Sequence, residues 1–196
     1  VEGPVLLHGE SAFGESLQFV RYAAMVAERS AGVIFECSAS LKPLLKNVRG
    51  VSQTTSPGDA LPPFAAHAPL FCLPRIFGTT LDNMPSPGAY VRADPAKAAE
   101  WRDLLEPRRA RLKVGVAWRG NPLNPNDHDR SIDPSLLAPL KTVPGVLLYS
   151  LQKDGLAAEI LPAGMTLIDF MPGIRDFSDT AALVSNLDLV ISVDTA

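Results

Sequence analysis

Short apolar runs alternate with longer segments of helical spacing along almost the whole chain. A helix repeats its apolar positions every three or four residues, whereas a buried strand is a short and nearly continuous apolar run. Strands that alternate with helices form βαβ units, in which a helix links two parallel strands. The sequence therefore predicts an α/β fold with parallel sheets. We expect strands at residues 5–7, 33–37, 70–73, 113–118, 146–151, 167–169 and 189–193.

A polar, amphipathic segment divides this alternation into two series. Residues 94–111 begin with Pro95, which suits the first turn of a helix, and carry Trp101, Leu104 and Leu105 on one expected face. We interpret 94–111 as a linker helix between a domain at 1–93 and the first part of a second domain at 112–196. The length of 196 residues fits one domain, or one domain and part of another. We expect the chain to be a piece of a longer protein.

The composition narrows the classes of partner. The 18 basic and 21 acidic side chains give a net charge of -3, and no lysine- and arginine-rich run occurs. A nucleic-acid binder needs a basic surface, so we expect no nucleic-acid partner.

No apolar run approaches the roughly 18 residues of a membrane span. Cys37 and Cys72 lie in apolar stretches without CxxC spacing, which predicts buried, reduced thiols and a cytoplasmic protein.

A glycine-bounded loop follows the first expected strand. The spacing from Gly9 through Gly14 to Ser16 resembles that of a phosphate-binding P-loop, but Glu15 stands where that loop needs a lysine. A carboxylate there repels phosphates, which argues against ATP or GTP hydrolysis. At the start of a helix, Glu15 could instead meet a substrate hydroxyl as a general base. The alternative is an acid that only stabilises the first helical turn, where the helix dipole would lower its basicity.

The densest polar cluster follows the strand expected at residues 113–118. Parallel sheets bind ligands beyond the carboxyl ends of their strands, so we expect a binding loop here. Arg130 can donate a fork of hydrogen bonds to a diphosphate, with a solvated surface arginine as the alternative. Asp127 and Asp129 match an Asp-x-Asp metal pattern, but acids in such loops commonly bond to nearby backbone, and we expect no metal site. The cluster comprises Arg119, Asn121, Asn124, Asn126, Asp127, His128, Asp129, Arg130 and Ser131.

Two further pairs of polar residues end strands of the second series. Gln152 and Lys153 follow the strand at 146–151 and could reach the base, ribose or phosphate of a nucleotide, or lie on the surface. Asp194 and Thr195 follow the strand at 189–193. A helix that began just beyond them would direct its N–H groups at a diphosphate. In the alternative, Asp194 only caps that helix.

Motifs from both series occur together in one order. They are His8-Gly9-Glu10, Gly14-Glu15, Leu17-Gln18-Phe19-Val20-Arg21-Tyr22, Ser150-Leu151-Gln152-Lys153, Asp179-Thr180-Ala181-Ala182 and Asp188-Leu189-Val190-Ile191-Ser192-Val193-Asp194-Thr195-Ala196. In these motifs the chain resembles the glycosyltransferase domain of bacterial tetratricopeptide-repeat proteins. That domain is similar to the heptosyltransferases (glycosyltransferase family 9) and more distantly to O-linked N-acetylglucosamine transferases. The resemblance spans nearly the whole chain, and its last motif is the most specific.

The resemblance implies a GT-B fold with two Rossmann-like domains, the second of which holds most of the nucleotide sugar. It implies metal-independent transfer with inversion, no cofactor apart from the nucleotide-sugar donor as substrate, a glycan or protein acceptor, and tetratricopeptide repeats before the domain. In heptosyltransferases an aspartate after the loop glycine is the proposed general base, and Glu15 occupies its position here. Arg130 sits where that family has a phosphate-binding lysine.

The leading hypothesis is transfer of a sugar from a nucleotide-diphosphate donor to an acceptor hydroxyl, with Glu15 as the base. One alternative is a non-catalytic module that binds a sugar nucleotide or a glycan. Another is a nucleotide-sugar epimerase of the same fold, which would act on the donor alone. The residues expected to bind the donor are Gly14, Arg119, Asn121, Arg130, Gln152, Lys153, Asp194 and Thr195.

Overall fold

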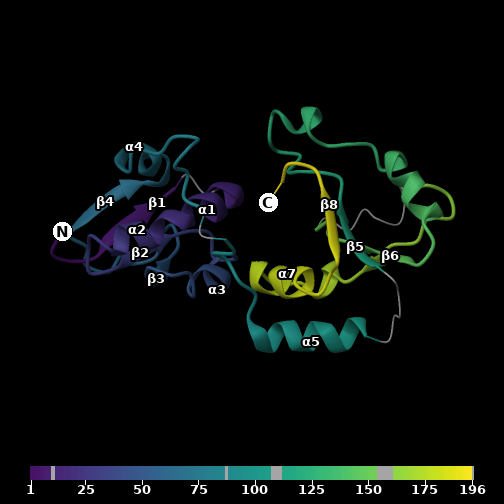
Figure 1. The fold of residues 1–196 in the computed structure, drawn as a ribbon, viewed down its shortest axis with the longest axis horizontal. Helices are drawn as coiled ribbons and strands as arrows, with labels where there is room; N and C mark the ends of the chain where they lie inside the picture. Colours follow the sequence, from purple (N-terminus) through teal and green to yellow (C-terminus); the bar gives the residue numbers. More distant parts are fainter. Residues whose placement is uncertain (10–11, 87, 107–111, 154–160, 196) are drawn as a thin grey trace. The chain divides into compact units, whose positions relative to one another are not determined.

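The chain folds into two compact units, shown in Figure 1. The computed structural model describes residues 1–9, 12–86, 88–106, 112–153 and 161–195. The first unit comprises Val1–Ala93 with the short segment Asp176–Ser178, and the second comprises Asp94–Arg175 with Asp179–Ala196. The motif residues Glu10 and Ala196 and the last part of the expected linker, 107–111, lie outside the described residues.

The first unit is built on a four-stranded parallel sheet in the order β3-β2-β1-β4. Leu6 pairs with Ile34 on one side and with His67 on the other, so the first strand of the chain lies inside the sheet. Leu7 and Phe35 are completely buried, as expected for apolar strands in a parallel sheet that is covered by helices. The strands are β1 (Val5–His8), β2 (Val33–Glu36), β3 (Val51–Thr55) and β4 (Ala66–Pro69).

Short helices connect these strands. The segment expected to be helical after the glycine loop forms three consecutive pieces, and the 41–45 segment forms one short helix. The helical elements are α1 (Phe13–Phe19), η1 (Val20–Tyr22), α2 (Ala23–Ala27), α3 (Lys42–Leu45), η2 (Leu70–Cys72) and α4 (Leu73–Ile76), where η marks a 3-10 helix.

The strand predicted at residues 70–73 is wrong, because this segment is helical in η2 and α4. Leu70 and Leu73 are buried while Phe71 is half exposed, so burial repeats every three residues instead of being continuous. Pro74 lies in the first turn of α4, where proline is tolerated because that N–H has no partner within the helix. A proline directly after an apolar run is compatible with the end of a strand, but here it belongs to the start of a helix.

The two edge strands of the first sheet were missed by the sequence analysis. β3 lies within a stretch that we interpreted in part as a loop, and β4 precedes the segment predicted as a strand. All of their residues except Thr55 are partly or largely exposed, and the two strands carry polar residues such as Gln53 and His67. An edge strand needs only one buried face and one bonded neighbour, so β3 and β4 form without a continuous apolar run.

The second unit contains another four-stranded parallel sheet, in the order β7-β6-β5-β8. Val114 pairs with Leu148 on one side and with Leu189 on the other. Parallel pairing of the strands near Val5 and Val33, and of those near Lys113, Val146 and Leu189, confirms the prediction of two βαβ series. The strands are β5 (Leu112–Ala117), β6 (Val146–Ser150), β7 (Ile168–Asp169) and β8 (Leu189–Ser192).

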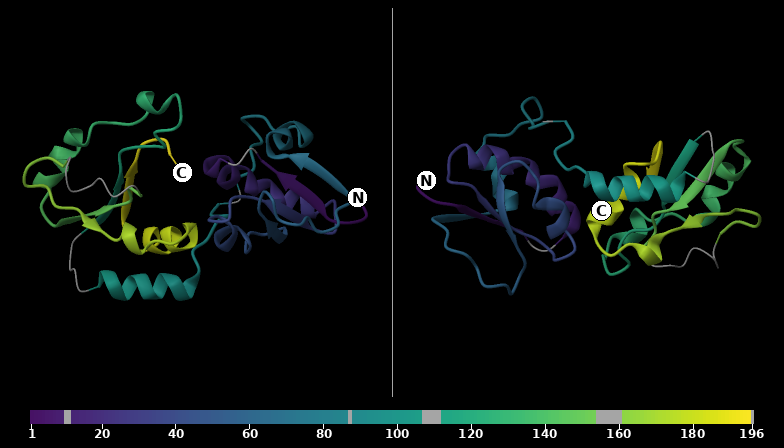
Figure 2. Two further views of the ribbon diagram at one scale, coloured as in Figure 1. Left: turned by 180° about the vertical axis from the view of Figure 1, so that it is seen from behind. Right: turned by 90° about the horizontal axis from the view of Figure 1, so that it is seen from below.

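The predicted linker segment forms α5 (Pro95–Leu105) within the second unit, side by side with α7 (Phe177–Val184), as Figures 1 and 2 show. The Asp94 carboxylate accepts hydrogen bonds from the N–H groups of Ala96 and Lys97 and caps α5. Trp101 and Leu105 are buried as expected, but Leu104 is 51% exposed, so its assignment to the same face was wrong. At about 100° per residue, Leu105 lies about 40° around the helix from Trp101. Leu104 lies about 60° from Trp101 in the opposite sense and about 100° from Leu105, at the margin of the packed side.

The remaining elements of the second unit are 3-10 helices in its connections. They are η3 (Asp127–Asp129), η4 (Pro134–Thr142) and η5 (Met171–Gly173). α7 begins with the Asp176 carboxylate accepting a hydrogen bond from the Ser178 N–H at 2.8 Å. No helix in the described part of the chain is both long and apolar enough to cross a membrane.

Both cysteines are free thiols in different environments. Cys37 is buried, and burial raises the pKa of its thiol to about 11 despite the opposing charge of Lys42. Cys72 is exposed, which contradicts the predicted burial of both thiols. It lies in η2, and the error follows from taking this segment as an interior strand.

Candidate functional site

The strand order of the second sheet identifies the edge at which a ligand would bind. The chain runs from β5 outward to β6 and β7, and then crosses to β8 on the other side of β5. In open α/β sheets, such a reversal leaves a crevice beyond the carboxyl ends of the two strands concerned. Ala117 at the end of β5 pairs with Ser192 at the end of β8, so the loops that follow them start side by side. Polar residues of these two loops form the candidate site.

The loop after β5 is held in shape by its own polar side chains. The Gly120 N–H donates to Oγ of Ser131 at 3.0 Å, and that hydroxyl donates to Oδ2 of Asp127 at 2.9 Å. The Ile132 N–H donates to the carbonyl of Trp118, whose side chain is buried in the core of the second unit. The polar loop is thus anchored at both ends to the end of β5.

Gly120 is required by close packing within this loop. A Cβ atom at this position would collide with Oδ1 of Asp127 and lie 3.0 Å from Nε of Arg130. Any larger residue would therefore displace two side chains of the loop. The sequence analysis did not single out Gly120, although a glycine directly after Arg119 at a strand end is a signal of close approach by other atoms.

Arg130 is held by a carboxylate and is not an ordinary solvated arginine. Its Nε atom lies 3.4 Å from Oδ1 of Asp127, and the two side chains are 25% and 13% exposed. The two terminal nitrogens of Arg130 make no hydrogen bond to any residue that the structure describes. One edge of the guanidinium is therefore fixed, and the N–H groups of its two terminal nitrogens can donate hydrogen bonds to an anionic ligand.

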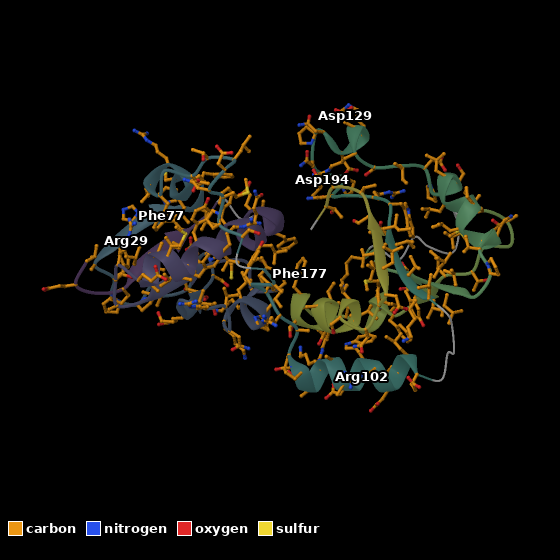
Figure 3. All side chains as sticks on the ribbon, viewed as in Figure 1. Arg29, Phe77, Arg102, Asp129, Phe177 and Asp194 are labelled. Carbon is orange, nitrogen blue, oxygen red and sulfur yellow. The ribbon has the colours of Figure 1, made fainter. Side chains whose placement is uncertain are left out.

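The Asp-x-Asp pattern divides into residues with different surroundings. Asp127 is engaged by Ser131 and Arg130, whereas Asp129 lies 3.1 Å from Nε2 of His128 and both of these side chains are mostly exposed. In the described ranges, no group of three or more histidine, cysteine or acidic side chains is arranged to hold a metal ion. Figure 3 labels Asp129 and Asp194 at the same end of the second unit.

Gln152 and Lys153 are both directed at backbone atoms. The Gln152 side chain is buried; its Oε1 accepts from the Arg119 N–H at 3.1 Å, and its Nε2 donates to the Arg119 carbonyl at 3.3 Å. Lys153 donates from Nζ to the carbonyl of Ile174 at 2.6 Å. Gln152 thus positions the start of the polar loop, because both ends of its amide bind the backbone of Arg119.

The other expected donor-binding residues lie at the surface of the second unit. Asn121 is exposed, and its Oδ1 accepts a hydrogen bond from the Leu123 N–H in a local turn. Asp194 and Thr195 are exposed after the end of β8, where the Val193 N–H donates to the Ala117 carbonyl. β5 and β8 thus bring Arg119, Arg130, Asp194 and Thr195 to one edge of the sheet.

Glu15 lies in the first turn of α1 in the first unit. Its Oε2 atom is buried and has no hydrogen-bond partner among the described residues. A buried carboxylate oxygen without a partner is costly and calls for an explanation, and a catalytic role is one of those known for such groups. Gly14 is exposed, and a Cβ atom there would meet nothing within 4 Å, so packing does not demand a glycine at that position.

Asp179 is a buried acid that the sequence analysis quoted only as a motif residue. It accepts hydrogen bonds from the Lys97 ammonium and from the side chain and backbone N–H of Arg175. Burial opposes the charged form, but the hydrogen bonds from Arg175 and Lys97 outweigh it and lower the pKa of Asp179 to about 2. An acid in the first turn of a predicted helix was the available signal, but it did not reveal the partner 82 residues earlier.

Comparisons with known proteins give one partial relationship. No family model matches the chain, and no solved structure matches it. The chain is 32% identical over 130 residues to protein FlbA of Caulobacter vibrioides, which covers 60% of this chain and 21% of FlbA. The chain therefore corresponds to about a fifth of the length of this curated relative.

Proposed function

We propose that the chain is part of a glycosyltransferase that moves a sugar from a nucleotide-diphosphate donor to an acceptor hydroxyl, without a metal and with inversion. In this proposal it has a GT-B arrangement and is related to the glycosyltransferase domain of tetratricopeptide-repeat proteins. The observation that carries the proposal is the reversal of strand order between β5 and β8, with the polar loop and Asp194-Thr195 following those two strands. We also propose a cytoplasmic location, where nucleotide sugars would be met.

On the donor side, Arg130 binds the diphosphate. Its fixed edge at Asp127 and its free terminal nitrogens support this role, because a pre-oriented guanidinium loses little freedom when it forms two hydrogen bonds to phosphate oxygens. The same contact stabilises the negative charge that develops on the leaving nucleotide diphosphate. Arg119, Asn121, Asp194 and Thr195 line the remainder of the donor site.

On the acceptor side, Glu15 takes the proton of the attacking hydroxyl. The acceptor oxygen then forms a bond to the anomeric carbon of the sugar, and the bond from that carbon to the phosphate oxygen breaks. The electron pair leaves with the nucleotide diphosphate, and attack opposite the leaving group inverts the anomeric configuration. The buried, unpartnered Oε2 supports this role, since a base must offer a free lone pair to the incoming hydroxyl.

A thermal-shift screen of the full-length protein against UDP-, GDP-, ADP- and CDP-linked sugars tests the proposal. A donor present at a hundred times its Kd stabilises the native state by about 2.7 kcal/mol and so raises Tm. The donor that gives the largest shift is then incubated with and without candidate glycan and protein acceptors. Sugar transfer only with an acceptor supports the proposal. Conversion of the donor alone would identify an epimerase, and binding without any turnover would identify a binding module.

A further inference from the structure

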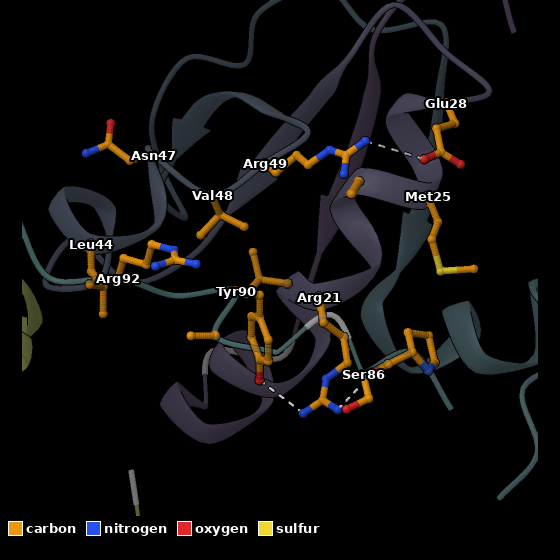
Figure 4. A pocket seen from close by; sticks show the side chains of 14 residues that line it. Arg21, Met25, Glu28, Leu44, Asn47, Val48, Arg49, Ser86, Tyr90 and Arg92 are labelled. Carbon is orange, nitrogen blue, oxygen red and sulfur yellow. Dashed lines mark hydrogen bonds and ion pairs between the residues drawn. The ribbon is translucent and has the colours of Figure 1, made fainter. Parts of the chain in front are cut away.

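A pocket of about 600 Å³ lies within the first unit, between α2, the chain after α3 and a covering segment (Figure 4). We define the covering segment as residues 85, 86 and 88–92. Sites for small ligands commonly have volumes of about 300 to 1,000 Å³, so the pocket is large enough for an organic molecule. Glu15 and the residues of the second unit are not among those that line it.

The pocket is distinct from the candidate transfer site. Asn47, Val48 and Arg49 immediately precede β3, and Glu28 precedes β2, so this end of the pocket lies at the amino-terminal edge of the parallel sheet. Glu15 follows the carboxyl end of β1 at the opposite edge. An occupant of the pocket therefore would not take the place of the acceptor hydroxyl at Glu15.

The floor of the pocket is apolar and well ordered by packing. Val20, Leu44 and Val48 are buried, and Ala24 adds a small side chain beside them. Gly50 allows the chain after α3 to approach α2, because a Cβ atom there would lie 2.5 Å from the backbone of Ala23. Such a floor accommodates a hydrocarbon or aromatic group by removing it from water.

The covering segment is attached by the motif residue Arg21. Its guanidinium donates to the hydroxyl of Tyr90 at 3.0 Å and to the carbonyl of Pro85 at 3.4 Å, and it lies over the Tyr90 ring at 4.9 Å from the centroid. Tyr22 adds a hydrogen bond from its hydroxyl to Oγ1 of Thr79 at 2.9 Å. The contacts of Arg21 with Tyr90 and Pro85 hold one wall of the pocket in place.

The rim of the pocket is positively charged. Arg21, Arg49 and Arg92 face a single acid, Glu28, although the whole chain is acidic with a net charge of -3. Arg49 is paired with Glu28 at 3.9 Å, and both side chains are largely exposed, so this ion pair contributes little and can be exchanged. Arg92 makes no hydrogen bond or ion pair with the residues that the structure describes.

We propose that this pocket binds an organic anion that joins an apolar body to a carboxylate or a phosphate. The apolar body lies on the floor formed by Val20, Leu44 and Val48, and Arg49 and Arg92 bind the charged group. Charge complementarity favours this occupant, because three arginines and a single glutamate line the pocket, whereas a simple ion would leave the apolar floor exposed to water.

Titration of the full-length protein with 1-anilinonaphthalene-8-sulfonate, followed by its fluorescence, tests the proposal. This probe joins an aromatic body to a fixed negative charge, and N-phenyl-1-naphthylamine provides a neutral counterpart. The R49Q/R92Q variant should bind the charged probe at least about 10-fold more weakly, the effect expected from lost charged hydrogen bonds. Its affinity for the neutral probe should stay within about twofold, since the apolar floor is unchanged. The R75Q/R102Q variant, which loses two exposed arginines elsewhere, should bind both probes as the unaltered protein does.

The charged group is identified by competition. Decanoate and decyl phosphate should displace the charged probe, and the stronger competitor names the preferred group, whereas decanol should displace it weakly. The Ala89→Trp variant, which fills the mouth from the exposed covering segment, should lose binding of both probes while keeping its Tm. Equal affinity of R49Q/R92Q and unaltered protein for the charged probe, or equal displacement by decanol, would overturn the proposal. Sugar transfer plays no part in these measurements, so they stand or fall separately from the proposed activity.

Discussion

The Nζ atom of Lys97 lies 2.6 Å from Oδ1 of Asp179 and joins α5 to the first turn of α7. The Asp179 side chain is 3% exposed, and Arg175 binds its second oxygen at 3.0 Å. Removing the charge of a buried acid with two cationic partners strongly destabilises the fold, because the two cations then remain without their counter-charge. This relationship leads to the first prediction, which concerns stability.

Asp179→Asn should lower the free energy of unfolding by about 3 kcal/mol at pH 7, the effect of breaking a buried ion pair. Chemical denaturation monitored by circular dichroism measures it. Asp103→Asn, on the exposed face of α5, is the matched control and should change stability by less than about 0.5 kcal/mol. A loss in Asp179→Asn no greater than that of the control would show that the contacts with Lys97 and Arg175 contribute nothing.

The same carboxylate should make stability depend on acid pH. The pKa of Asp179 is lowered from 3.8 to about 2 in the folded state, so folding favours its ionised form. Its contribution, about 2 kcal/mol from this shift, is fully present above pH 4 and is lost as the pH falls from about 4 to 2. The stability difference between the unaltered protein and Asp179→Asn should therefore shrink over that range. A difference that stays constant down to pH 2 would contradict the assignment.

Arg130→Ala should weaken binding of a nucleotide-diphosphate sugar to the full-length protein by about 1.5 to 3 kcal/mol, the range for a hydrogen bond to a charged group. Isothermal titration calorimetry with the donor found in the thermal-shift screen measures the change. Arg102→Ala removes an exposed arginine from α5 and should leave the affinity unchanged. If Arg130→Ala also binds with unchanged affinity, the guanidinium stabilises only its own loop.

Gly120→Ala should reduce the affinity for the nucleotide sugar, although it removes no hydrogen-bonding group. The added methyl group collides with Asp127 and must shift Arg130, so we expect a loss in the same direction as that of Arg130→Ala. Gly173→Ala in η5 is the control, because a Cβ atom there meets nothing within 4 Å. Equal donor affinities of the two glycine variants would show that the shape of the polar loop is unimportant for binding.

Glu15→Gln should lower kcat by about 10²- to 10⁴-fold, because glutamine cannot accept the proton of the acceptor hydroxyl. The Kd of the donor should change by less than about twofold. Glu15→Asp keeps a carboxylate at this position and should retain much of the activity. Steady-state kinetics of the full-length protein with a saturating acceptor measure the effect, with Glu2→Gln as an exposed control. Transfer by Glu15→Gln within a few-fold of the unaltered rate would mean that Glu15 only stabilises the start of α1.

The interior strands and the edge strands β7 and β8 could be predicted from sequence, whereas the edge strands β3 and β4 could not. β1 and β5 each contain a continuous buried run without polar side chains, 5–7 and 114–116, because both faces of these interior strands are covered, and this pattern is visible without a structure. β3 and β4 are exposed over much of their length, so their sequences resemble those of loops. The strand predicted at residues 70–73 was wrong for a different reason. A short apolar segment fits a strand or a helix equally well until its neighbours are known.

The candidate site shows the same division between local and distant information. The sequence identified the polar residues at strand ends, including Arg119, Arg130 and Asp194, because a residue's place at the end of an apolar run is a local property. It assigned the Gln152 amide to a nucleotide or to the surface, but the side chain binds the backbone of Arg119, 33 residues away. That choice depends on β5 and β6 being neighbours.

The sequence by itself determined the alternation of parallel strands and helices and the start of α5 at Pro95, since hydrophobic periodicity and the preference of proline for a first helical turn act over a few residues. Only the tertiary structure decided the strand order around β5, the enclosure of Asp179 by Lys97 and the close approach at Gly120. These features arise when segments far apart in the chain meet in space. Their energies depend on distance and burial, which a linear pattern does not contain.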